Sequence, residues 1–496
     1  MSTGMVRDPG VRRLVNAVLV PGFVGTQLPP WLADELADGL GGVCWFAHNV
    51  PDRDTARLLA DEIHEAGRRA LVWCDEEGGS VARLDLAAGS PWPGHAALGR
   101  LDDVAVTRAV AEGIGASAHD AGIDVVLAPV VDVNSDPLNP VIGVRSFGDS
   151  PDLVARHGTA FVEGLQSTGV AGCAKHYPGH GATRVDSHLG LPVVNADLDV
   201  LWPRELAPFV AAAKAGVRCL LTAHVVFPAV DTEPATMSTT WLRLLREQIG
   251  FDGVVGTDAL DMRAISAGVG RGEGAVAALR AGVDAVCIGN PEFPEKYDDV
   301  TVLADVRSAV LRAVDDGRLS VERVAEAAGR LDDLSEWTRR RLRSLPPHPA
   351  RIGLDAARRS LQVDGDVRLT GDPLLLAHQA GSIAAGDVRF PIERFLREAR
   401  PRTTYRQVTG PADTAAAMSA HPDLVPVVVT DGLAGTQVVD AVREVAPNAP
   451  VVHTGPAGTA PDVAAPLIRT WGGGAASARA AAERLLGATC EAAGER

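Results

Sequence analysis

The sequence has no long uninterrupted apolar segment and none of the usual marks of an exported protein. Its most apolar N-terminal stretch, Leu14–Val24, is interrupted by Asn16, Pro21 and Gly22, and no small-residue cleavage site follows it. A membrane-spanning helix needs about 20 consecutive apolar residues, and a signal peptide needs an apolar core followed by a cleavage site. We therefore expect no signal peptide, no membrane span and no membrane partner.

Cysteine is also scarce, with six residues at positions 44, 74, 173, 219, 287 and 490. None forms a CxxC pair, and the first five each fall inside an apolar run. Buried thiols without a paired spacing are typical of cytosolic proteins, where cysteines stay reduced. We expect reduced thiols and a cytoplasmic protein.

Basic residues are outnumbered, since 47 Lys and Arg face 63 Asp and Glu and leave a formal net charge of -16. A protein that binds nucleic acid needs a basic surface to displace counterions from the phosphates, so this balance argues against such a partner. Aromatic residues make up only 4%, whereas the apolar share is an ordinary 46% with abundant Ala, Gly and Val. This mixture favours an α/β protein and excludes a disordered chain or a coiled coil.

Short apolar runs alternate with longer segments of helical period over about the first 290 residues. The runs are continuously apolar, as expected of parallel strands buried on both faces. Eight strand-helix units predict a (β/α)8 TIM-type barrel, although an open doubly wound sheet would give the same alternation. The predicted strands are Leu14–Val20, Gly42–Phe46, Ala70–Cys74, Val125–Val130, Val170–Ala174, Cys219–Ala223, Gly253–Thr257 and Ala285–Ile288, and helix candidates between them include Thr55–Ala66, Val104–Ala118, Leu153–Leu165 and Ala207–Ala215.

The positions of polar residues favour the barrel. Asp75, Asp132, Lys175-His176, His224 and Asp258 each follow closely on the end of a predicted strand. A barrel gathers the carboxyl ends of its strands around one mouth, where its active site forms, whereas an open sheet spreads them along an edge.

A second, smaller α/β domain is predicted after the barrel. The pattern from Leu303 to Arg343 is helical and charged and ends at Pro346-Pro347, which suggests a boundary between residues 1–345 and 346–496. Beyond it the strand-helix rhythm restarts, with predicted strands at Leu374–His378, Thr403–Val408, Val425–Asp431 and Pro450–Thr454.

The segment from Lys175 to His188 is the richest in chemistry, because one Lys, three His and an Asp crowd a Gly-rich stretch after a strand. Glycines and a proline there predict an irregular loop, and polar groups on barrel loops are positioned for ligands. A single histidine in such a place is more often incidental than functional. This density of polar groups favours a functional loop.

This segment resembles the signature of the β-N-acetylglucosaminidases of glycoside hydrolase family 3, a Lys-His-Phe-Pro-Gly-His-Gly run followed shortly by Asp-Ser-His. Other pieces similar to the same family follow in the same order over most of the first 290 residues, while the C-terminal domain resembles the accessory domain of the family only loosely. The matching pieces are residues 22–26 (GFVGT), 75–84 (DEEGGSVARL), 128–132 (APVVD), 139–148 (NPVIGVRSFG), 222–225 (TAHV) and 256–262 (GTDALDM).

The resemblance implies a retaining β-N-acetylglucosaminidase in which Asp258 is the nucleophile. A carboxylate at a strand end can attack an anomeric carbon and form a glycosyl-enzyme. Taken alone, Asp258 could equally be a helix N-cap, and Asp261 is a competing carboxylate. The resemblance further implies that His188 and Asp186 form the acid/base dyad, since imidazole exchanges protons near neutral pH. Asp186 could instead only cap a turn.

Substrate-binding roles implied by the resemblance fall to Asp75, Arg83, Arg145, Lys175 and His176. Carboxylates accept hydrogen bonds from sugar hydroxyls, while Arg and Lys donate to sugar oxygens. Arg83 and Arg145 could also be members of a buried ion-pair network. We expect His180 and His224 to be structural, and Asp132 and Asn134 to shape the pocket without an assigned role. The sequence departs from the family pattern at Tyr177, Ala182, Glu76 and Ala47-His48, which bears on fine substrate preference.

Other activities remain open from the sequence. A His acid/base does not repel phosphate as a carboxylate would, so a β-N-acetylglucosaminide phosphorylase is the nearest rival. Less favoured are a β-glucosidase-type activity, a Schiff-base enzyme using Lys175, a metal site built from His176, His180, Asp186 and His188, and a sugar-binding protein without activity. We expect no cofactor, no metal, and a carbohydrate substrate such as a muropeptide or chitin fragment.

Overall fold

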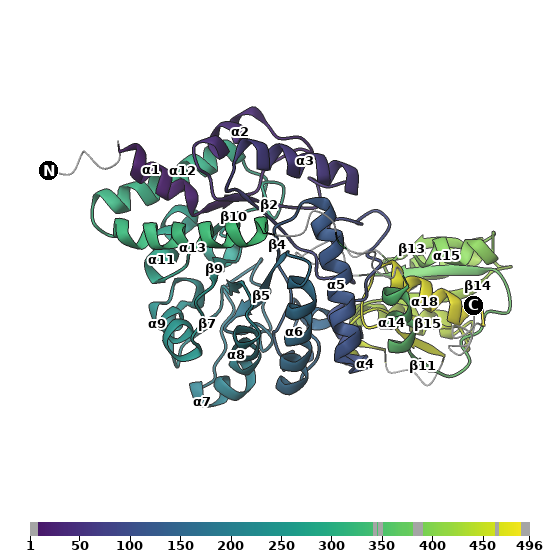
Figure 1. The fold of residues 1–496 in the computed structure, drawn as a ribbon. Coiled ribbons are helices and arrows are strands. Elements are labelled where there is room, and N and C mark those ends of the chain that lie inside the picture. The colour runs from purple at the N-terminus through teal and green to yellow at the C-terminus, as the bar shows by residue number, and fades with distance from the viewer. Residues whose placement is uncertain (1–7, 341–344, 346–350, 380–389, 462–465, 488–496) are drawn as a thin grey trace.

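The computed structural model describes residues 8–340, 345, 351–379, 390–461 and 466–487, and these form a helix-covered barrel beside a smaller α/β part (Figure 1). The boundary predicted at 345–346 falls in a stretch of which only residue 345 is described. Among the described residues, no helix is both long enough and apolar enough to cross a membrane.

The first part is the predicted (β/α)8 barrel. Six parallel strands pair in the order β2-β3-β4-β5-β6-β9, and a second parallel ladder joins β1 to β10. A bridge between Gly256 and Ala285 connects β9 to β10, and β1 lies beside β2, so the eight strands run round a closed circle. The strands are β1 (Leu19–Pro21), β2 (Gly42–Trp45), β3 (Leu71–Cys74), β4 (Val125–Val126), β5 (Ala171–Tyr177), β6 (Cys219–Thr222), β9 (Val254–Thr257) and β10 (Val286–Gly289), and a short hairpin of β7 (Val226–Phe227) and β8 (Asp231–Pro234) follows β6.

Helices cover the outside of the barrel, and local capping explains where several of them begin. The Asp52 side chain accepts from the Thr55 amide and the Ser150 side chain from the Leu153 amide, so each satisfies one of the unpaired amides at a helix start. The helices are α1 (Pro9–Ala17), α2 (Pro30–Ala37), α3 (Arg53–Ala66), α4 (His95–Leu101), α5 (Val104–Ala121), α6 (Pro151–Gln166), α7 (Leu198–Leu201), α8 (Ala207–Lys214), α9 (Thr239–Arg243), α10 (Arg263–Ser266), α11 (Gly270–Ala281), α12 (Asp299–Asp315) and α13 (Val321–Arg339), with short irregular helices η2 (Gly143–Arg145), η3 (Trp202–Leu206), η4 (Ala235–Met237) and η5 (Leu244–Ile249).

Three strand predictions were wrong in part. The strand expected at Leu14–Val20 is mostly helix α1, which Asp8 caps through the Gly10 amide, and the strand begins only at Leu19. The strand expected at Val125–Val130 ends at Val126, where the Ala128 amide turns back to the Val126 carbonyl at 2.8 Å, and pairing with β5 resumes only at a bridge between Val130 and Lys175. Lys175 and His176 were expected just after a strand but lie inside β5.

The second part is a six-stranded sheet in the order β11-β16-β15-β14-β12-β13, parallel except for the antiparallel pair β11-β16. Apolar clusters pack on both faces, as in a doubly wound sheet. Four strands match the predicted runs, and β11 and β16 were missed. The elements are β11 (Gln362–Asp364), β12 (Pro373–His378), β13 (Thr404–Gln407), β14 (Val425–Thr430), β15 (Val451–His453), β16 (Leu467–Arg469), α14 (Ile352–Ser360), α15 (Ile392–Ala399), α16 (Pro411–Ala420), α17 (Thr436–Arg443) and α18 (Ala475–Leu485), with η6 (Leu433–Gly435) and η7 (Ala457–Thr459).

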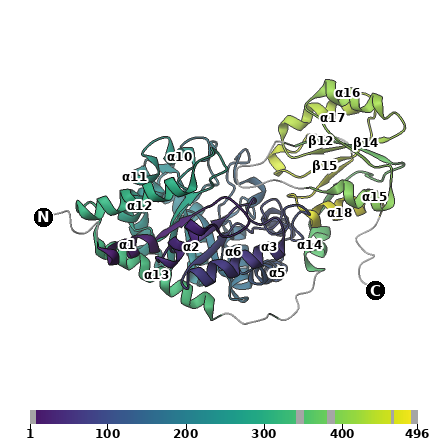
Figure 2. The same cartoon turned by 90° about the horizontal axis from the view of Figure 1, so that it is seen from above.

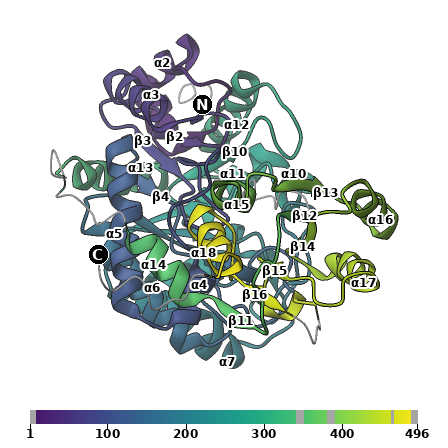
Figure 3. The same cartoon turned by 90° about the vertical axis from the view of Figure 1, so that its right-hand side faces the viewer.

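The two parts meet along α14 and α18 (Figure 2). Helix α14 packs against α4 and α5 of the barrel, and its Arg359 pairs with Asp103 at 2.9 Å. The first two amides of α18 donate to the carbonyl of Ser90, at 2.8 and 3.2 Å. The second part therefore rests on barrel loops, and Figure 3 shows it in front of one end of the barrel.

Candidate active site

A pocket of about 260 Å³ opens at the carboxyl ends of the barrel strands, where a (β/α)8 barrel places its active site. Its lining runs from Val20 on β1 to Pro294 in the loop after β10. Seven of the eight predicted site residues line this one pocket. They are Asp75, Arg83, Arg145, Lys175, His176, His188 and Asp258, and the eighth, Asp186, lies behind His188.

One side of the pocket is a chain of five buried or half-buried charges. Lys175 lies on β5 and reaches the loop after β3, where its Nζ is 2.7 Å from both Asp75 and Glu77. Asp75 pairs with Arg83 at 3.0 Å, and Glu77 binds Arg145 with both oxygens, at 2.8 and 3.1 Å. The two arginines therefore belong to an ion-pair network, and because they also line the pocket their substrate-binding role stays a prediction. Such a wall presents both donors and acceptors to a polyhydroxylated ligand.

The network decides against Lys175 as a Schiff-base nucleophile. Burial alone would lower the pKa of Lys175, but the charges of Asp75 and Glu77 raise the pKa above its usual value. An amine must lose its proton before it attacks a carbonyl, and this ammonium is held in its charged form.

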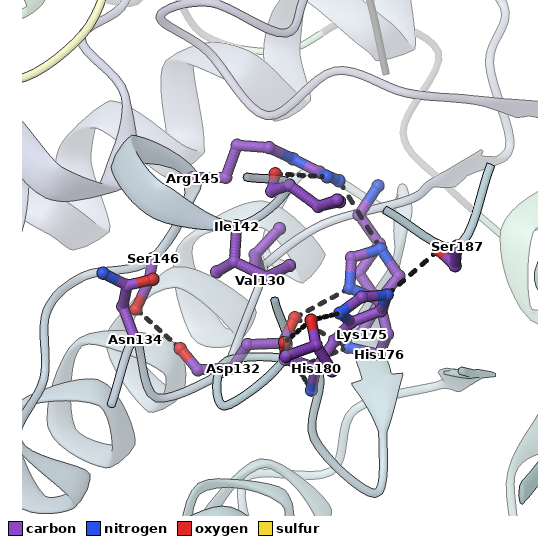
Figure 4. Close-up of polar contacts among 12 residues, drawn as sticks. Val130, Asp132, Asn134, Ile142, Arg145, Ser146, Lys175, His176, His180 and Ser187 are labelled. Atoms are coloured by element: carbon purple, nitrogen blue, oxygen red, sulfur yellow. Dashed lines mark hydrogen bonds and ion pairs between the residues drawn. The ribbon is translucent and has the colours of Figure 1, made fainter. Parts of the chain in front are cut away.

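Asp132 organises the base of the loop that follows β5 (Figure 4). Its carboxylate accepts from His176 Nδ1 at 2.7 Å and from the His180 amide at 2.6 Å. This leaves His176 Nε2 facing Arg145, 3.5 Å from Nη2. A Cβ on Gly181 would lie 1.7 Å from the Val133 carbonyl oxygen, so only glycine allows the loop to approach so closely. Sequence reasoning left Asp132 without a role, and its place as the shared acceptor explains its burial.

His180 continues this support towards His188. Its ring bonds to Thr183 Oγ1 at 2.8 Å and to Ser187 Oγ at 3.0 Å. Burial lowers the pKa of His180 to about 4, so the ring is neutral at pH 7. Its contacts hold the residue that precedes His188, and its own ring is not positioned as an acid.

Asp258 lies at the end of β9 and is half-buried in the pocket. Burial alone would raise its pKa, but the imidazoles of His176, His224 and His188 and the Ala259 amide lower the pKa of Asp258 to about 2. His224 Nε2 donates to the Ala259 carbonyl at 3.0 Å and so fixes the residue after Asp258. Asp258 is thus an ionised carboxylate at neutral pH, as a nucleophile requires.

The competing carboxyl, Asp261, also lines the pocket but has a different environment. It accepts from the Asn290 amide at 2.5 Å, and Tyr297 OH lies 3.4 Å away. Burial raises the pKa of Asp261 to about 7, so much of it is protonated at neutral pH. At neutral pH Asp258 is therefore ionised, whereas Asp261 is only partly ionised.

His188 and Asp186 meet as the resemblance implies. His188 Nδ1 lies 2.7 Å from Asp186 Oδ1, which also accepts the His188 amide at 2.8 Å. Asp186 therefore both closes a turn and orients the ring, and the other ring nitrogen is left for a ligand. The Arg263 amide donates to the His188 carbonyl and the Ala264 amide to the Ser187 carbonyl, each at 3.3 Å. These bonds connect the loop to the segment after Asp258.

The histidines of the loop do not converge on a shared point. The rings of His176, His180 and His188 bond to different side chains, and in the described part of the chain no cluster of three or more His, Cys, Asp or Glu residues could hold a metal ion. The five described cysteines are free thiols, while Cys490 lies outside the described residues.

Glu77 is the site residue that sequence reasoning missed. The sequence did contain a signal for it, because side chains alternate in an extended stretch, so that residues 75 and 77 point to the same side. Asp75 and Glu77 reach the same lysine, while Glu76 points away and accepts the Arg83 and Leu84 amides at 2.7 and 3.1 Å.

We predict opposite effects on stability for the two neighbouring glutamates. Burial raises the pKa of Glu76 from 4.5 to about 7, so the folded state keeps this proton to higher pH than the unfolded state. The free energy of unfolding therefore falls as pH rises from 4.5 through 7, and Glu76→Gln removes this loss because glutamine does not titrate. We expect Glu76→Gln to raise the free energy of unfolding by about 2 kcal/mol at pH 8 and to have little effect at pH 4.5.

Glu77→Gln is the matched control. Burial opposes the charge of Glu77, but Arg145 and Lys175 hold its pKa well below the usual value, so the substitution leaves two buried cations poorly paired. We expect it to lower the free energy of unfolding by about 3 kcal/mol at pH 8. Urea unfolding at both pH values tests the pair, and a destabilised Glu76→Gln at pH 8 would contradict the first expectation.

Comparison with known proteins identifies the family and the fold. Residues 28–334 match the Glycosyl hydrolase family 3 N terminal domain. The chain is 34% identical over 334 residues to a beta-hexosaminidase A from Pseudoalteromonas piscicida, covering 62% of this chain but only 55% of that protein. It is 36% identical over 284 residues to a beta-hexosaminidase from Xanthomonas axonopodis pv. citri, covering 56% of this chain and 84% of that protein.

Similarity to a solved structure extends over both parts of the chain. A glycoside hydrolase family 3 beta-N-acetylglucosaminidase from Paenibacillus sp. str. FPU-7 superposes with a TM-score of 0.83 at 29% identity, covering 96% of each chain. Because the family domain matches more than half of the chain, the protein belongs to glycosyl hydrolase family 3.

Proposed function

We propose that the protein is a retaining β-N-acetylhexosaminidase that removes terminal β-linked N-acetylglucosamine through a covalent intermediate on Asp258. The observation that carries the proposal is that Asp258 and the Asp186-bound ring of His188 line one pocket. The relatives named beta-hexosaminidase and the beta-N-acetylglucosaminidase from Paenibacillus support the choice of sugar.

In the first step, Asp258 attacks the anomeric carbon while His188 gives a proton to the departing glycosidic oxygen. The carboxylate needs no prior deprotonation, since its pKa is about 2. Asp186 holds the ring through Nδ1 and stabilises its positive charge, so the proton is delivered from Nε2. The C1–O bond to the leaving group breaks as the C1–Asp258 ester bond forms.

In the second step, His188 accepts a proton from a water molecule that attacks the same carbon and releases Asp258. Two inversions at one carbon give net retention, so the first product is the β-anomer. The hydroxyls of the sugar meet Asp75, Arg83, Arg145, Lys175 and His176, which line the same pocket, and the limited volume of about 260 Å³ favours one terminal sugar over an internal unit of a chain.

Turnover of p-nitrophenyl β-N-acetylglucosaminide, followed by proton NMR of the first product, tests the proposal. We expect β-N-acetylglucosamine as the first product, the same products in the presence of phosphate, and much slower cleavage of the matching β-glucoside. N-acetylglucosamine 1-phosphate as the main product would overturn the hydrolase assignment in favour of a phosphorylase. Faster cleavage of the glucoside would overturn the choice of sugar.

The source of the substrate is part of the proposal. Fragments of peptidoglycan or chitin carry terminal β-linked N-acetylglucosamine, and the unpaired spacing of the cysteines supports action in the cytoplasm. Release of N-acetylglucosamine from a muropeptide fragment and from chitobiose, compared at equal concentration, measures which source the enzyme prefers.

A further inference from the structure

The second part of the chain touches two barrel loops that carry site arginines. The loop after β3 contains Ser80 and Arg83, and the loop after β4 leads into η2 with Gly143 and Arg145. Among the described residues, the pocket lining comes from the barrel alone. The second part can therefore act on the site through these loops.

The first contact holds the loop of Arg83. The amide of Gly473 donates to Ser80 Oγ at 2.9 Å in a buried position. A Cβ on Gly474 would lie 3.0 Å from the carbonyl oxygen of Gly79 and 3.1 Å from the carbonyl oxygen of Ser90. The two backbones are therefore in close contact. Residues 472–475 thus close over the turn that precedes Arg83.

The second contact holds the turn of Arg145. A Cβ on Gly143 would lie 2.8 Å from Pro456 Cγ, so the proline ring rests on the turn two residues before Arg145. Nearby, a Cβ on Gly458 would lie 2.8 Å from Pro137 Cβ, where the same barrel loop passes. Residues 455–459 therefore contact the loop after β4 at two points.

The loop that carries Pro456 is held by its own hydrogen bonds. The Pro456 carbonyl accepts from the Thr459 amide at 3.0 Å, from Thr459 Oγ1 at 3.0 Å and from His453 Nε2 at 3.1 Å. His453 is fully buried at the end of β15, and burial lowers its pKa to about 4, so it stays a neutral donor to this carbonyl. These bonds fix the place of Pro456 within its loop, and so the place where it contacts the barrel.

The two contacts sit at the two ends of the charge chain Arg83-Asp75-Lys175-Glu77-Arg145. The carboxyl edge of a doubly wound sheet is where such folds bind ligands. Here the ends of β15 and β16 at that edge lead into the loops that meet the barrel. We propose that residues 455–459 and 472–475 form a clamp that positions Arg145 and Arg83 for the sugar. The proposal rests on the proposed function and gives the second part a role in substrate affinity.

The clamp predicts a specific kinetic effect for Pro456→Gly, which removes the ring and loosens the loop while keeping its carbonyl. We expect KM for p-nitrophenyl β-N-acetylglucosaminide to rise about three- to tenfold, and the inhibition constant of free N-acetylglucosamine to rise by the same factor, because small displacements of binding groups weaken affinity. The value of kcat should change less than about twofold. Arg359→Ala, which breaks an ion pair between the same two parts away from these loops, is the matched control and should leave KM unchanged.

A double-mutant cycle decides whether Pro456 acts through Arg145. If it does, Pro456→Gly changes KM in the wild type but has no further effect in an Arg145→Ala background. The same test applies to Ser80→Ala with Arg83→Ala. Additive effects, an unchanged KM in Pro456→Gly, or an equal rise in Arg359→Ala would each overturn the clamp while the hydrolase assignment stands. A wild-type protein that cleaves no N-acetylhexosaminide overturns the proposed function and the clamp together.

Discussion

Asp258→Ala is expected to lower kcat by roughly 10⁴-fold or more, the largest effect of any substitution considered, because no covalent intermediate can form without the nucleophile. The loss should appear in kcat measured with p-nitrophenyl β-N-acetylglucosaminide at saturating substrate. Incubation of the wild type with a 5-fluoro N-acetylglucosaminide, which slows breakdown of the intermediate, should add the mass of one sugar to the peptide that contains Asp258.

Asp261→Asn is the matched control for this prediction. Asp261 lines the same pocket three residues away, but it accepts from the Asn290 amide and its pKa is raised to about 7 by burial. A carboxyl with a pKa of about 7 is only about half ionised at neutral pH, whereas Asp258 is fully ionised, so we expect a much smaller loss of kcat than in Asp258→Ala. The same loss in both variants, with the trapped sugar on Asp261, would show that the nucleophile is misassigned.

Much of the barrel was predictable because its strands are buried on both faces and therefore read as unbroken apolar runs. The same feature explains the error at Leu14–Val20. A short apolar run does not distinguish a strand from a buried helix segment, and the deciding signal was local, namely the Asp8 cap and Pro9 at the helix start. Strands β11 and β16 were missed because neither stands out as an apolar run: β11 has one apolar residue between Gln362 and Asp364, and β16 has two apolar residues before Arg469.

The site was predictable to the extent that polar residues follow strand ends in a barrel. That rule and the family motifs identified Asp75, Lys175 and Asp258, which line the pocket together. Pairing between distant segments was not readable. Asp132 is 44 residues from His176, and only the fold shows that its carboxylate anchors both that ring and the His180 amide. The contacts of the second part with residues 80 and 143 likewise depend on how two separate folds meet.

His188→Ala is expected to lower kcat by about 10²- to 10⁴-fold when the leaving group is poor, the usual contribution of a general acid. The effect should depend on the leaving group, because a 2,4-dinitrophenolate departs without a proton whereas an alcohol or a sugar does not. We therefore expect the first step for the dinitrophenyl N-acetylglucosaminide to be nearly unimpaired, and the rate for the methyl glycoside or chitobiose to fall by the full factor. Pre-steady-state release of dinitrophenol measures the first step separately.

The dependence on the leaving group separates a chemical role of the ring from a structural one. The loop is held by two backbone bonds, from the Arg263 amide to the His188 carbonyl and from the Ala264 amide to the Ser187 carbonyl. It is also held by the hydrogen bond between the His180 ring and the Ser187 hydroxyl. None of these bonds uses the His188 side chain, so the alanine variant should keep its loop and its affinity for N-acetylglucosamine. Asp186→Asn keeps an oxygen for Nδ1 but loses the negative charge, and an intermediate loss with the same leaving-group dependence is expected of it. If His188→Ala instead slowed release of dinitrophenol and methanol by the same factor, the ring would not be delivering the proton, and another group in the pocket would have to supply it.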